Sequence, residues 1–216
     1  MNIISENVIQ LNQLLSQPLP VAKPNSFYVN VNSYYDDFVS ISKSLTDDEI
    51  RNYIDINGRK HIHQYFMDIA YKVAERSTCV KRKVGAIIVK DKKIVSCGYN
   101  GISAGITNCT ENNCILKESG KCGKFPIHAE VNCCLFATPD ERKGATMYIT
   151  CQACSNCASV IVNSGITTVI YDQKHNPEVN ILSEANITEL QLLEAIRADL
   201  YKRENFIRNQ LSPKAI

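Results

Sequence analysis

Four residues in this sequence are spaced for metal-assisted acid–base chemistry: His128, Glu130, Cys154 and Cys157. Glu130 lies two positions after His128, and the Cys-x-x-Cys pair begins 26 positions after the histidine. One imidazole and two thiolates can bind a zinc ion and leave its fourth tetrahedral position to water, as in catalytic zinc sites. Zinc lowers the pKa of bound water toward ~7, so a nearby carboxylate can take a proton from it. We therefore predict a catalytic zinc site in which Glu130 transfers protons.

Neither half of this pattern is specific alone, because His-x-Glu is common by chance and Cys-x-x-Cys also occurs in redox and structural sites. Both halves in this order resemble the signature of zinc-dependent nucleobase deaminases, and this resemblance implies hydrolytic deamination of a nucleobase. In that reaction Glu130 delivers a proton to ring N3 of a cytosine and then to the leaving amine, acting as base and then as acid. Ala129, with its minimal side chain, would let the backbone approach the edge of the base. A zinc-binding protein without catalysis is the alternative.

The elements that position these residues follow from hydrophobic periodicity. The expected helices cover 60–76, 128–137, 154–163 and 187–207, and the expected strands cover 84–89, 94–98, 145–150 and 167–172. The first two strands are expected to form a hairpin. This order predicts an α/β fold with three layers, α/β/α, in which helices flank a mixed sheet. Two helices begin at the predicted ligands, where backbone N–H groups and the helix dipole favour thiolate over thiol.

Size and composition bound the class of protein. The chain has 216 residues and a net charge of +2, which fits one domain of ~150 residues plus an extension and does not favour a polynucleotide partner. No apolar run approaches the ~20 residues that cross a bilayer, and the polar N-terminus does not resemble a secretory signal. Ten cysteines without an export signal favour metal binding in a reducing compartment, so we expect a cytoplasmic protein without membrane contact.

The first 58 residues differ from the rest of the chain. Three of the seven prolines lie within 18–24 and prevent a continuous helix there. Thr46 begins a capping-box pattern, from which we expect a short helix toward Asp55 that ends at Gly58. Because no residue of this region suggests chemistry, we predict an N-terminal extension at 1–58, acting as a docking arm or a flap, and the zinc-dependent domain at 59–216.

A second metal site is predicted from cysteines in one loop. Cys109, Cys114 and Cys122 lie within 14 residues that are rich in Asn, Gly and Lys. A loop with so little apolar content would be ordered by a tetrahedral structural zinc, with Cys79 as the expected fourth thiolate. Four free thiols and a zinc with another fourth ligand are the alternatives, and Cys151 competes for the fourth place.

Further segments resemble the deoxycytidylate (dCMP) deaminases of the zinc-dependent, cytidine-deaminase-like superfamily. Besides the two zinc elements, the resemblance over about residues 60–172 lies in Arg76-Ser77-Thr78-Cys79, Lys83-Val84-Gly85-Ala86, Gly98-Tyr99-Asn100-Gly101 and Asn163-Ser164-Gly165-Ile166. It implies hydrolysis of dCMP to dUMP and ammonia, which supplies dUMP for thymidylate synthesis. It also implies a homo-oligomer, often a hexamer, that dCTP activates and dTTP inhibits.

The resemblance also assigns roles to single residues. It implies that Asn100 contacts the deoxyribose and that Gly98, Tyr99, Asn100 and Gly101 bind the nucleotide effector; a tight turn after a strand is the simpler interpretation of this segment. Arg82 and Lys83 are candidates for the 5′-phosphate, since arginine can bind two of its oxygens, although such basic clusters are more often solvated. Ala153 and Ser103 each replace a proline of the family pattern. The first change bears on rigidity, and the second on regulation more than on catalysis.

Two other classes of function remain open. The chain could deaminate another substrate, such as dCTP, cytidine, free cytosine or the adenosine of a tRNA. It could instead be a catalytically inactive, nucleotide-sensing subunit, against which the presence of Glu130 argues. A polynucleotide substrate is disfavoured because no basic, aromatic-rich tract is present. For His61, His63 and His175 we expect surface or packing roles.

Overall fold

The computed structural model describes residues 6–16, 40–41, 43–55, 58–110, 114, 126–175 and 180–211, with side chains up to 202. Contacts between residues divide the chain into two compact units. The larger unit is Tyr65–Leu192, and the smaller unit combines the residues up to Gln64 with those from Leu193 onward. The predicted domain boundary after residue 58 stays a prediction. In the part of the chain that is described, no helix is long and apolar enough to cross a membrane.

The larger unit is built on a five-stranded mixed sheet in the order β2-β1-β5-β6-β7. The strands are β1 (Gly85–Lys90), β2 (Lys93–Tyr99), β5 (Thr146–Cys151), β6 (Thr168–Gln173) and β7 (Thr188–Gln191). β1 is antiparallel to β2 and β5, whereas β5, β6 and β7 run parallel. The predicted hairpin is confirmed: β1 and β2 are joined at Asp91 and Lys92, whose φ angles of 50° and 63° suit a two-residue turn.

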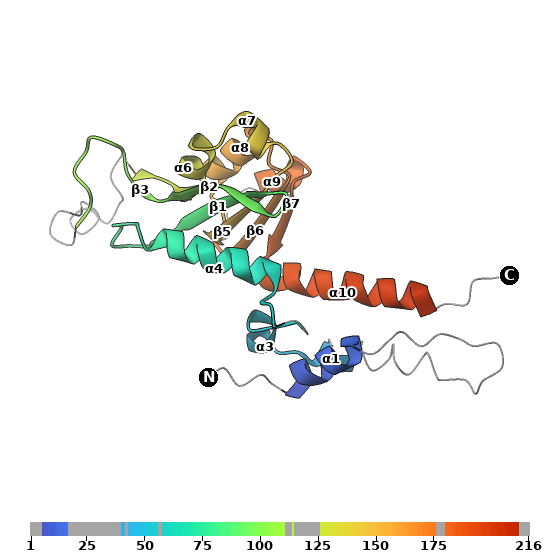
Figure 1. Cartoon of the computed structure of the whole chain (residues 1–216). Helices are drawn as coiled ribbons and strands as arrows, with labels where there is room; N and C mark the ends of the chain where they lie inside the picture. Colours follow the sequence, from blue (N-terminus) through green and yellow to red (C-terminus); the bar gives the residue numbers. More distant parts are fainter. Residues whose placement is uncertain are drawn as a thin grey trace, which may run out of the picture. The chain divides into compact units, whose positions relative to one another are not determined.

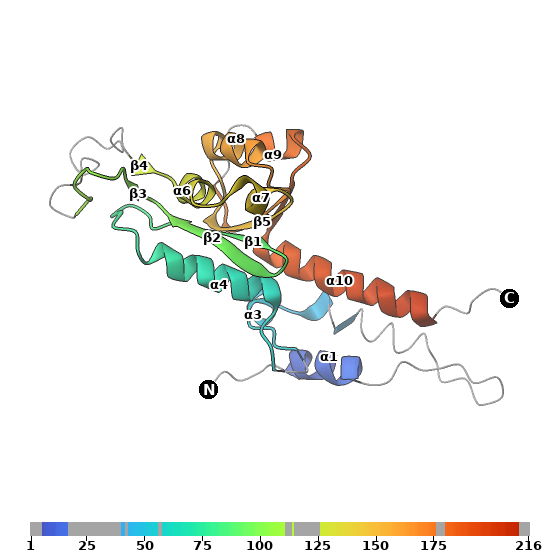
Figure 2. The same ribbon diagram turned by 45° about the horizontal axis from the view of Figure 1, so that its top comes forward.

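Helices cover both faces of this sheet (Figures 1 and 2). α4 (Ile62–Ala74) runs along one face, and α6 (Ala129–Leu135) and α8 (Ser155–Asn163) lie on the other. Two single-turn helices, α7 (Pro139–Arg142) and α9 (Ile181–Glu184), complete the second layer of helices. The predicted three-layer α/β/α fold is therefore confirmed. The buried core lies mainly between the sheet and the pair α6 and α8, where Ile88, Met147 and Ile161 are fully buried.

Two strand glycines allow helices to approach the sheet closely, one on each face. A Cβ atom on Gly85 would lie 2.1 Å from the carbonyl oxygen of Ala70 in α4. A Cβ atom on Gly98 would lie 2.4 Å from the backbone nitrogen of Cys133 and 2.5 Å from the carbonyl oxygen of Ala129, both in α6. Both clashes are with backbone atoms, so no change of rotamer relieves them. Gly98 thus has a packing role that brings α6 against β2.

The predicted long helix at 187–207 is wrong in its first turn. Residues 188–191 form β7, which pairs with β6 so that Thr188 lies opposite Thr168 and Leu190 opposite Ile170. The helix, α10, begins only at Leu192 and ends at Leu211. Leu190 has helical spacing to the apolar residues that follow it, but pairing with β6 satisfies the backbone N–H and C=O groups of this segment in the sheet. A periodic pattern does not reveal such a distant partner.

The smaller unit contains α1 (Glu6–Ser16), α3 (Asp47–Arg51) and most of α10. The predicted capping box is confirmed, because the Thr46 side chain accepts from the backbone N–H of Glu49 and the Glu49 carboxylate accepts from that of Thr46. The helix ends at Arg51 and not at Gly58, which instead has a φ of 73° in a turn closed on Asp55. The proline-rich stretch at 18–24 lies outside the described residues.

His61 and His63 have a packing role in this unit. Their Nε2 atoms lie 3.8 and 3.2 Å from the same carboxylate oxygen of Asp199 in α10. Burial, opposed by Asp199, lowers the pKa of His61 to about 4, so this imidazole is neutral at pH 7. The predicted packing role of these two histidines is confirmed.

Candidate active site

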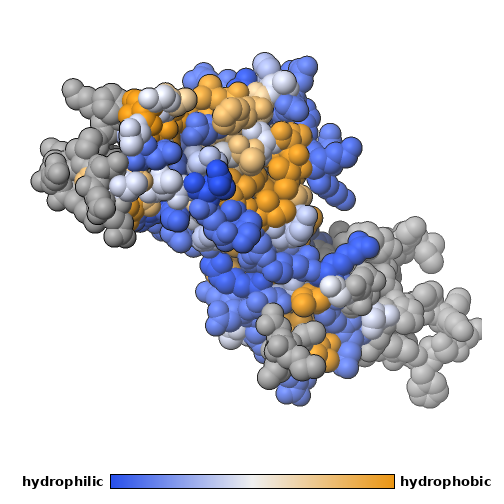
Figure 3. Space-filling model, turned by 60° about the vertical axis from the view of Figure 1, so that its left-hand side comes forward, coloured by the Kyte–Doolittle hydropathy of each residue, from blue (hydrophilic) through white to orange (hydrophobic). Residues whose placement is uncertain are grey.

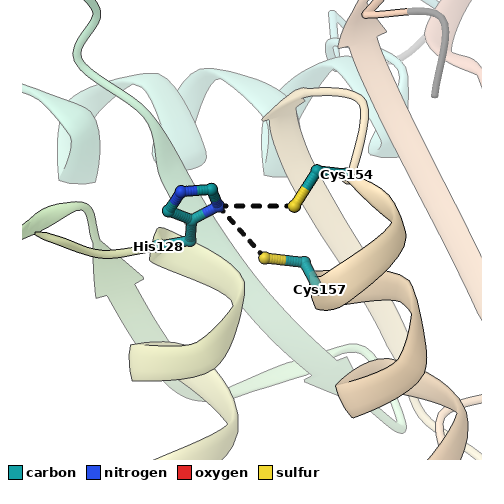
Figure 4. A group of neighbouring side chains, drawn as sticks. All are labelled: His128, Cys154 and Cys157. Carbon is teal, nitrogen blue, oxygen red and sulfur yellow. Dashed lines mark hydrogen bonds between the residues drawn. The ribbon is translucent and has the colours of Figure 1, made fainter. Parts of the chain in front are cut away.

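The three predicted zinc ligands meet at one point of the larger unit (Figure 4). Nδ1 of His128 lies 3.6 Å from Sγ of Cys154 and 3.2 Å from Sγ of Cys157. The three ligand atoms lie within 4.8 Å of one another. Within the described ranges, no other three His, Cys, Asp or Glu side chains form such a group. The geometry therefore fits the binding of one small cation.

Two helix N-termini position these ligands. His128 is the N-cap residue of α6 and Cys154 is that of α8, and both have extended backbone angles. Neither side chain makes a capping hydrogen bond, so both point away from their helices and toward each other. His128 follows the short strand β4 (Pro126–Ile127), which pairs with β3 (Gly101–Ile102). The positive ends of both helix dipoles thus face the site.

The donor set fits zinc. Burial raises the pKa of the Cys157 thiol well above its usual range, and the neighbouring Glu130 and Cys154 raise it further. Such a thiol becomes a thiolate at neutral pH only with a strong positive charge beside it, and zinc supplies that charge. With one nitrogen and two sulfurs, and no fourth protein ligand among the residues described, the group matches a catalytic zinc site more closely than a structural one.

Glu130 lies beside the ligands without belonging to the group. It sits in the first turn of α6, is only 4% exposed, and its carboxyl group interacts with the Cys157 thiol. Burial raises the pKa of Glu130 to about 7. A carboxyl group with a pKa near neutrality can both accept and donate a proton at physiological pH, which is the property required of an acid–base catalyst.

A cavity of about 360 Å³ opens onto His128, Glu130 and Cys154. Of the residues predicted to bind substrate, Asn100, Ala129 and Arg82 line it. The fourth predicted residue, Lys83, does not line this cavity. It lines a neighbouring pocket of about 470 Å³, and Lys81 and Arg82 line the cavity as well as this pocket. The volume of the first cavity is in the range of small-molecule sites.

Asn100 is held by the backbone that precedes β1. Its Oδ1 accepts a hydrogen bond from the Val84 N–H at 2.8 Å, and its Nδ2 donates to the Arg82 carbonyl at 2.9 Å. Asn100 therefore fixes the segment that carries Arg82, whatever contact it makes with a substrate. The other members of the predicted effector segment, Gly98, Tyr99 and Gly101, line neither of the two pockets.

The predicted second zinc site stays a prediction. Cys122 lies outside the described residues, and Cys79, Cys109 and Cys114 do not form a compact group of the kind found at His128. Cys79 borders both pockets. The competing ligand, Cys151, is buried in the catalytic cavity, where its Sγ accepts from Arg82 Nη1 at 2.9 Å.

Sequence reasoning did not identify Cys151 as a partner of Arg82, and it did not place Gln152 or His175 at the catalytic cavity, which all three line. Cys151 ends β5, Gln152 follows it, and His175 comes soon after β6. The carboxyl ends of neighbouring parallel strands meet at one edge of a sheet, where ligands commonly bind. The predicted positions of the two strands were therefore the signal that could have identified these residues.

Comparison with known proteins identifies the family. The model of the cytidine and deoxycytidylate deaminase zinc-binding region matches residues 60–173, more than half of the chain. The chain belongs to this deaminase family. The match contains His128, Cys154 and Cys157, so the predicted resemblance and the predicted zinc-dependent deaminase class are confirmed.

Individual relatives are moderately similar to this chain. The chain is 39% identical to ComE operon protein 2 of Bacillus subtilis over 150 residues, which cover 66% of this chain and 77% of that protein. It is 36% identical over 120 residues to the deoxycytidylate deaminase of Mycobacterium phage D29, covering 51% and 94%. The crystal structure of the cyanophage S-TIM5 dCMP deaminase in complex with dCMP and dUMP superposes with a TM-score of 0.52 at 26% identity, covering 60% and 96%.

Proposed function

We propose that this chain hydrolyses dCMP to dUMP and ammonia, and so supplies dUMP for thymidylate synthesis. The observation that carries this proposal is the buried Glu130 carboxyl group beside the His128, Cys154 and Cys157 group, at the base of a cavity large enough for a small ligand. The substrate is supported by relatives named deoxycytidylate deaminases at 36% and 34% identity and by the dCMP complex of the S-TIM5 enzyme.

Three residues of the site would bind zinc, and a fourth residue transfers protons. His128, Cys154 and Cys157 would hold the zinc ion, which when bound acts as a Lewis acid and lowers the pKa of water. Glu130 takes a proton from the attacking water and delivers it to ring N3 as the oxygen adds to C4. It then moves the proton of the new C4 hydroxyl group to the exocyclic amine, the C4–N bond breaks as the C4 carbonyl forms, and ammonia leaves. A pKa of about 7 suits Glu130 to both transfers.

The proposal includes the remaining features that the resemblance implies: a structural zinc at the loop cysteines, regulation by dCTP and dTTP, and a homo-oligomer. Figure 3 shows hydrophobic side chains gathered on one face of the larger unit. Among the described residues of this unit, the most exposed apolar side chains are Leu135 and Phe136, at the end of α6, which are 67% and 75% exposed. Exposed apolar area is typical of protein contacts, which supports the oligomer.

A second candidate substrate is dCTP. The pocket lined by Lys81, Arg82 and Lys83 adjoins the catalytic cavity and shares Lys81 and Arg82 with it. This basic extension provides room and charge for more than one phosphate. The dCTP reaction would use the same zinc ligands and the same Glu130.

Ammonia release from dCMP, dCTP, deoxycytidine and tRNA by the zinc-loaded protein tests these alternatives together. We expect kcat/KM to be highest for dCMP, about tenfold or more above the value for deoxycytidine, because one charge-assisted phosphate contact already supplies such a factor. A higher kcat/KM for dCTP or tRNA would refute the assignment of dCMP. Ammonia release from none of the four would favour the inactive, nucleotide-sensing subunit.

A further inference from the structure

Three basic side chains of the smaller unit share a single carboxylate. Nε2 of His61 and Nε2 of His63 lie 3.8 and 3.2 Å from Oδ2 of Asp199, and Nζ of Lys202 lies 3.4 Å from Oδ1 of the same group. The centroids of the two imidazole rings are 5.3 Å apart. Asp199 and Lys202 belong to α10, whereas the two histidines lie at the start of α4. We call these four residues the histidine cluster.

A hydrogen bond holds His61 in its neutral form. Its Nδ1 accepts from the backbone N–H of His63 at 3.3 Å, which assigns the ring proton to Nε2. A second proton on Nδ1 would face this N–H donor and break the hydrogen bond. The two imidazole side chains are only 12% and 18% exposed, and the His61 ring packs edge-on against the buried Tyr53 ring. Little water is therefore available to solvate a charge on either ring.

Acidification changes the charge balance of the histidine cluster. At neutral pH the cluster holds one negative charge, on Asp199, and one positive charge, on Lys202. Protonation of both imidazoles adds two positive charges, and one carboxylate cannot pair with three cations. Burial, and next the neighbouring His63, lower the pKa of His61 from 6.5 to about 4, and burial also lowers the pKa of His63. The unfolded chain therefore takes up protons first, so stability falls as the pH drops from 6.5 toward about 4.

The histidine cluster joins distant segments of the chain. The backbone N–H of His61 donates to the Tyr53 carbonyl at 3.3 Å, and the Tyr53 hydroxyl donates to Oδ1 of Asn12 in α1 at 3.1 Å. α10 also contacts the start of α3 through the ion pair of Arg197 with Asp47, but this pair is solvent-exposed and contributes little. The contact between α10 and the segment before α4 thus depends strongly on the cluster.

We propose that the histidine cluster is an acid-sensitive switch, which holds α10 against the start of α4 at neutral pH and releases it on acidification. The inference concerns the smaller unit and does not depend on the proposed function. It assigns a regulatory role to side chains that lie outside the catalytic cavity. The release follows from charge repulsion within the cluster and needs no ligand.

Hydrogen–deuterium exchange of the full-length, zinc-loaded protein, measured by mass spectrometry at pH 7.5 and pH 5 and corrected for intrinsic exchange rates, tests the switch. The equilibrium constant for opening of α10 should rise about 30-fold, as the lowered pKa of His61 requires. The double variant His61→Asn, His63→Gln keeps neutral polar groups but cannot take up protons, so its rise should stay below about threefold. His175→Gln, which removes an exposed imidazole of the larger unit, is the control and should respond like the native protein.

Two results would overturn the switch: no rise for α10 in the native protein, or an equal rise in the double variant. If the double variant does not fold, NMR titration of the imidazole resonances of the native protein decides. A His61 ring that titrates below pH 5, together with opening of α10 over the same range, supports the switch. A His61 ring that titrates at pH 6.5 or above overturns it.

Discussion

Replacement of Glu130 by alanine is expected to lower kcat for dCMP by at least ~100-fold, the usual contribution of an acid–base residue, while the protein keeps its catalytic zinc. Two features of the site lead to this expectation. The Glu130 carboxyl group is buried beside Cys157, where it can reach a substrate in the cavity. It is not one of the three side chains whose ligand atoms converge, so its removal leaves the ligand set intact.

Steady-state kinetics combined with zinc analysis of the same samples measures both parts of this prediction. Glu130→Gln should be as slow as Glu130→Ala, because an amide of similar volume cannot carry the proton. Glu75→Ala serves as the control, since it removes a glutamate that is 64% exposed on its side chain and does not line the cavity. A Glu130 variant with unimpaired turnover would exclude the proposed mechanism, and loss of zinc would show that the carboxyl group has a structural role.

Substitution of Cys157 by serine is expected to remove the catalytic zinc and nearly all activity. Cys157 is 2% exposed and its Sγ lies 3.2 Å from Nδ1 of His128. A serine hydroxyl is not ionised at neutral pH and is a poorer zinc ligand than a thiolate, so only two of the three ligands remain. We expect kcat/KM to fall at least ~100-fold, consistent with loss of zinc-assisted water activation.

Cys134→Ser provides a matched control for this variant. Cys134 is also 2% exposed and belongs to the same core cluster, but it lies outside the ligand group. Both substitutions exchange a buried sulfur for an oxygen, so they should cost similar stability, whereas only Cys157→Ser should release zinc. Zinc content per chain and thermal unfolding of the two variants make the comparison. Retention of zinc and activity by Cys157→Ser would contradict the assignment of this ligand.

The zinc group was predictable from sequence because its geometry is largely local. His128 and Cys154 each begin a helix, and Cys157 follows Cys154 by about one helical turn. Sequence spacing therefore fixes where each ligand lies relative to its own helix. The alternation of strands and helices then limits how the two helices can be arranged on one face of a sheet.

The parts that were missed depend on contacts between distant segments. Lys83 and Arg82 are neighbours in sequence, yet Arg82 lines the catalytic cavity and Lys83 lines only the pocket beside it. His175 lines the cavity from the segment after β6, where its N–H donates to the Gln152 side chain that follows β5. The strand β7 forms only because β6 offers a partner. No pattern within any of these segments reveals the partner.

Anomalous X-ray diffraction from crystals of the purified protein, recorded above and below the zinc absorption edge, tests the proposed catalytic centre most directly. We expect a zinc peak bound by Nδ1 of His128 and by the sulfurs of Cys154 and Cys157, with no fourth protein ligand and with the Glu130 carboxyl group facing the open position. A peak elsewhere only, or a fourth side chain completing the coordination shell at this position, would contradict a hydrolytic zinc centre.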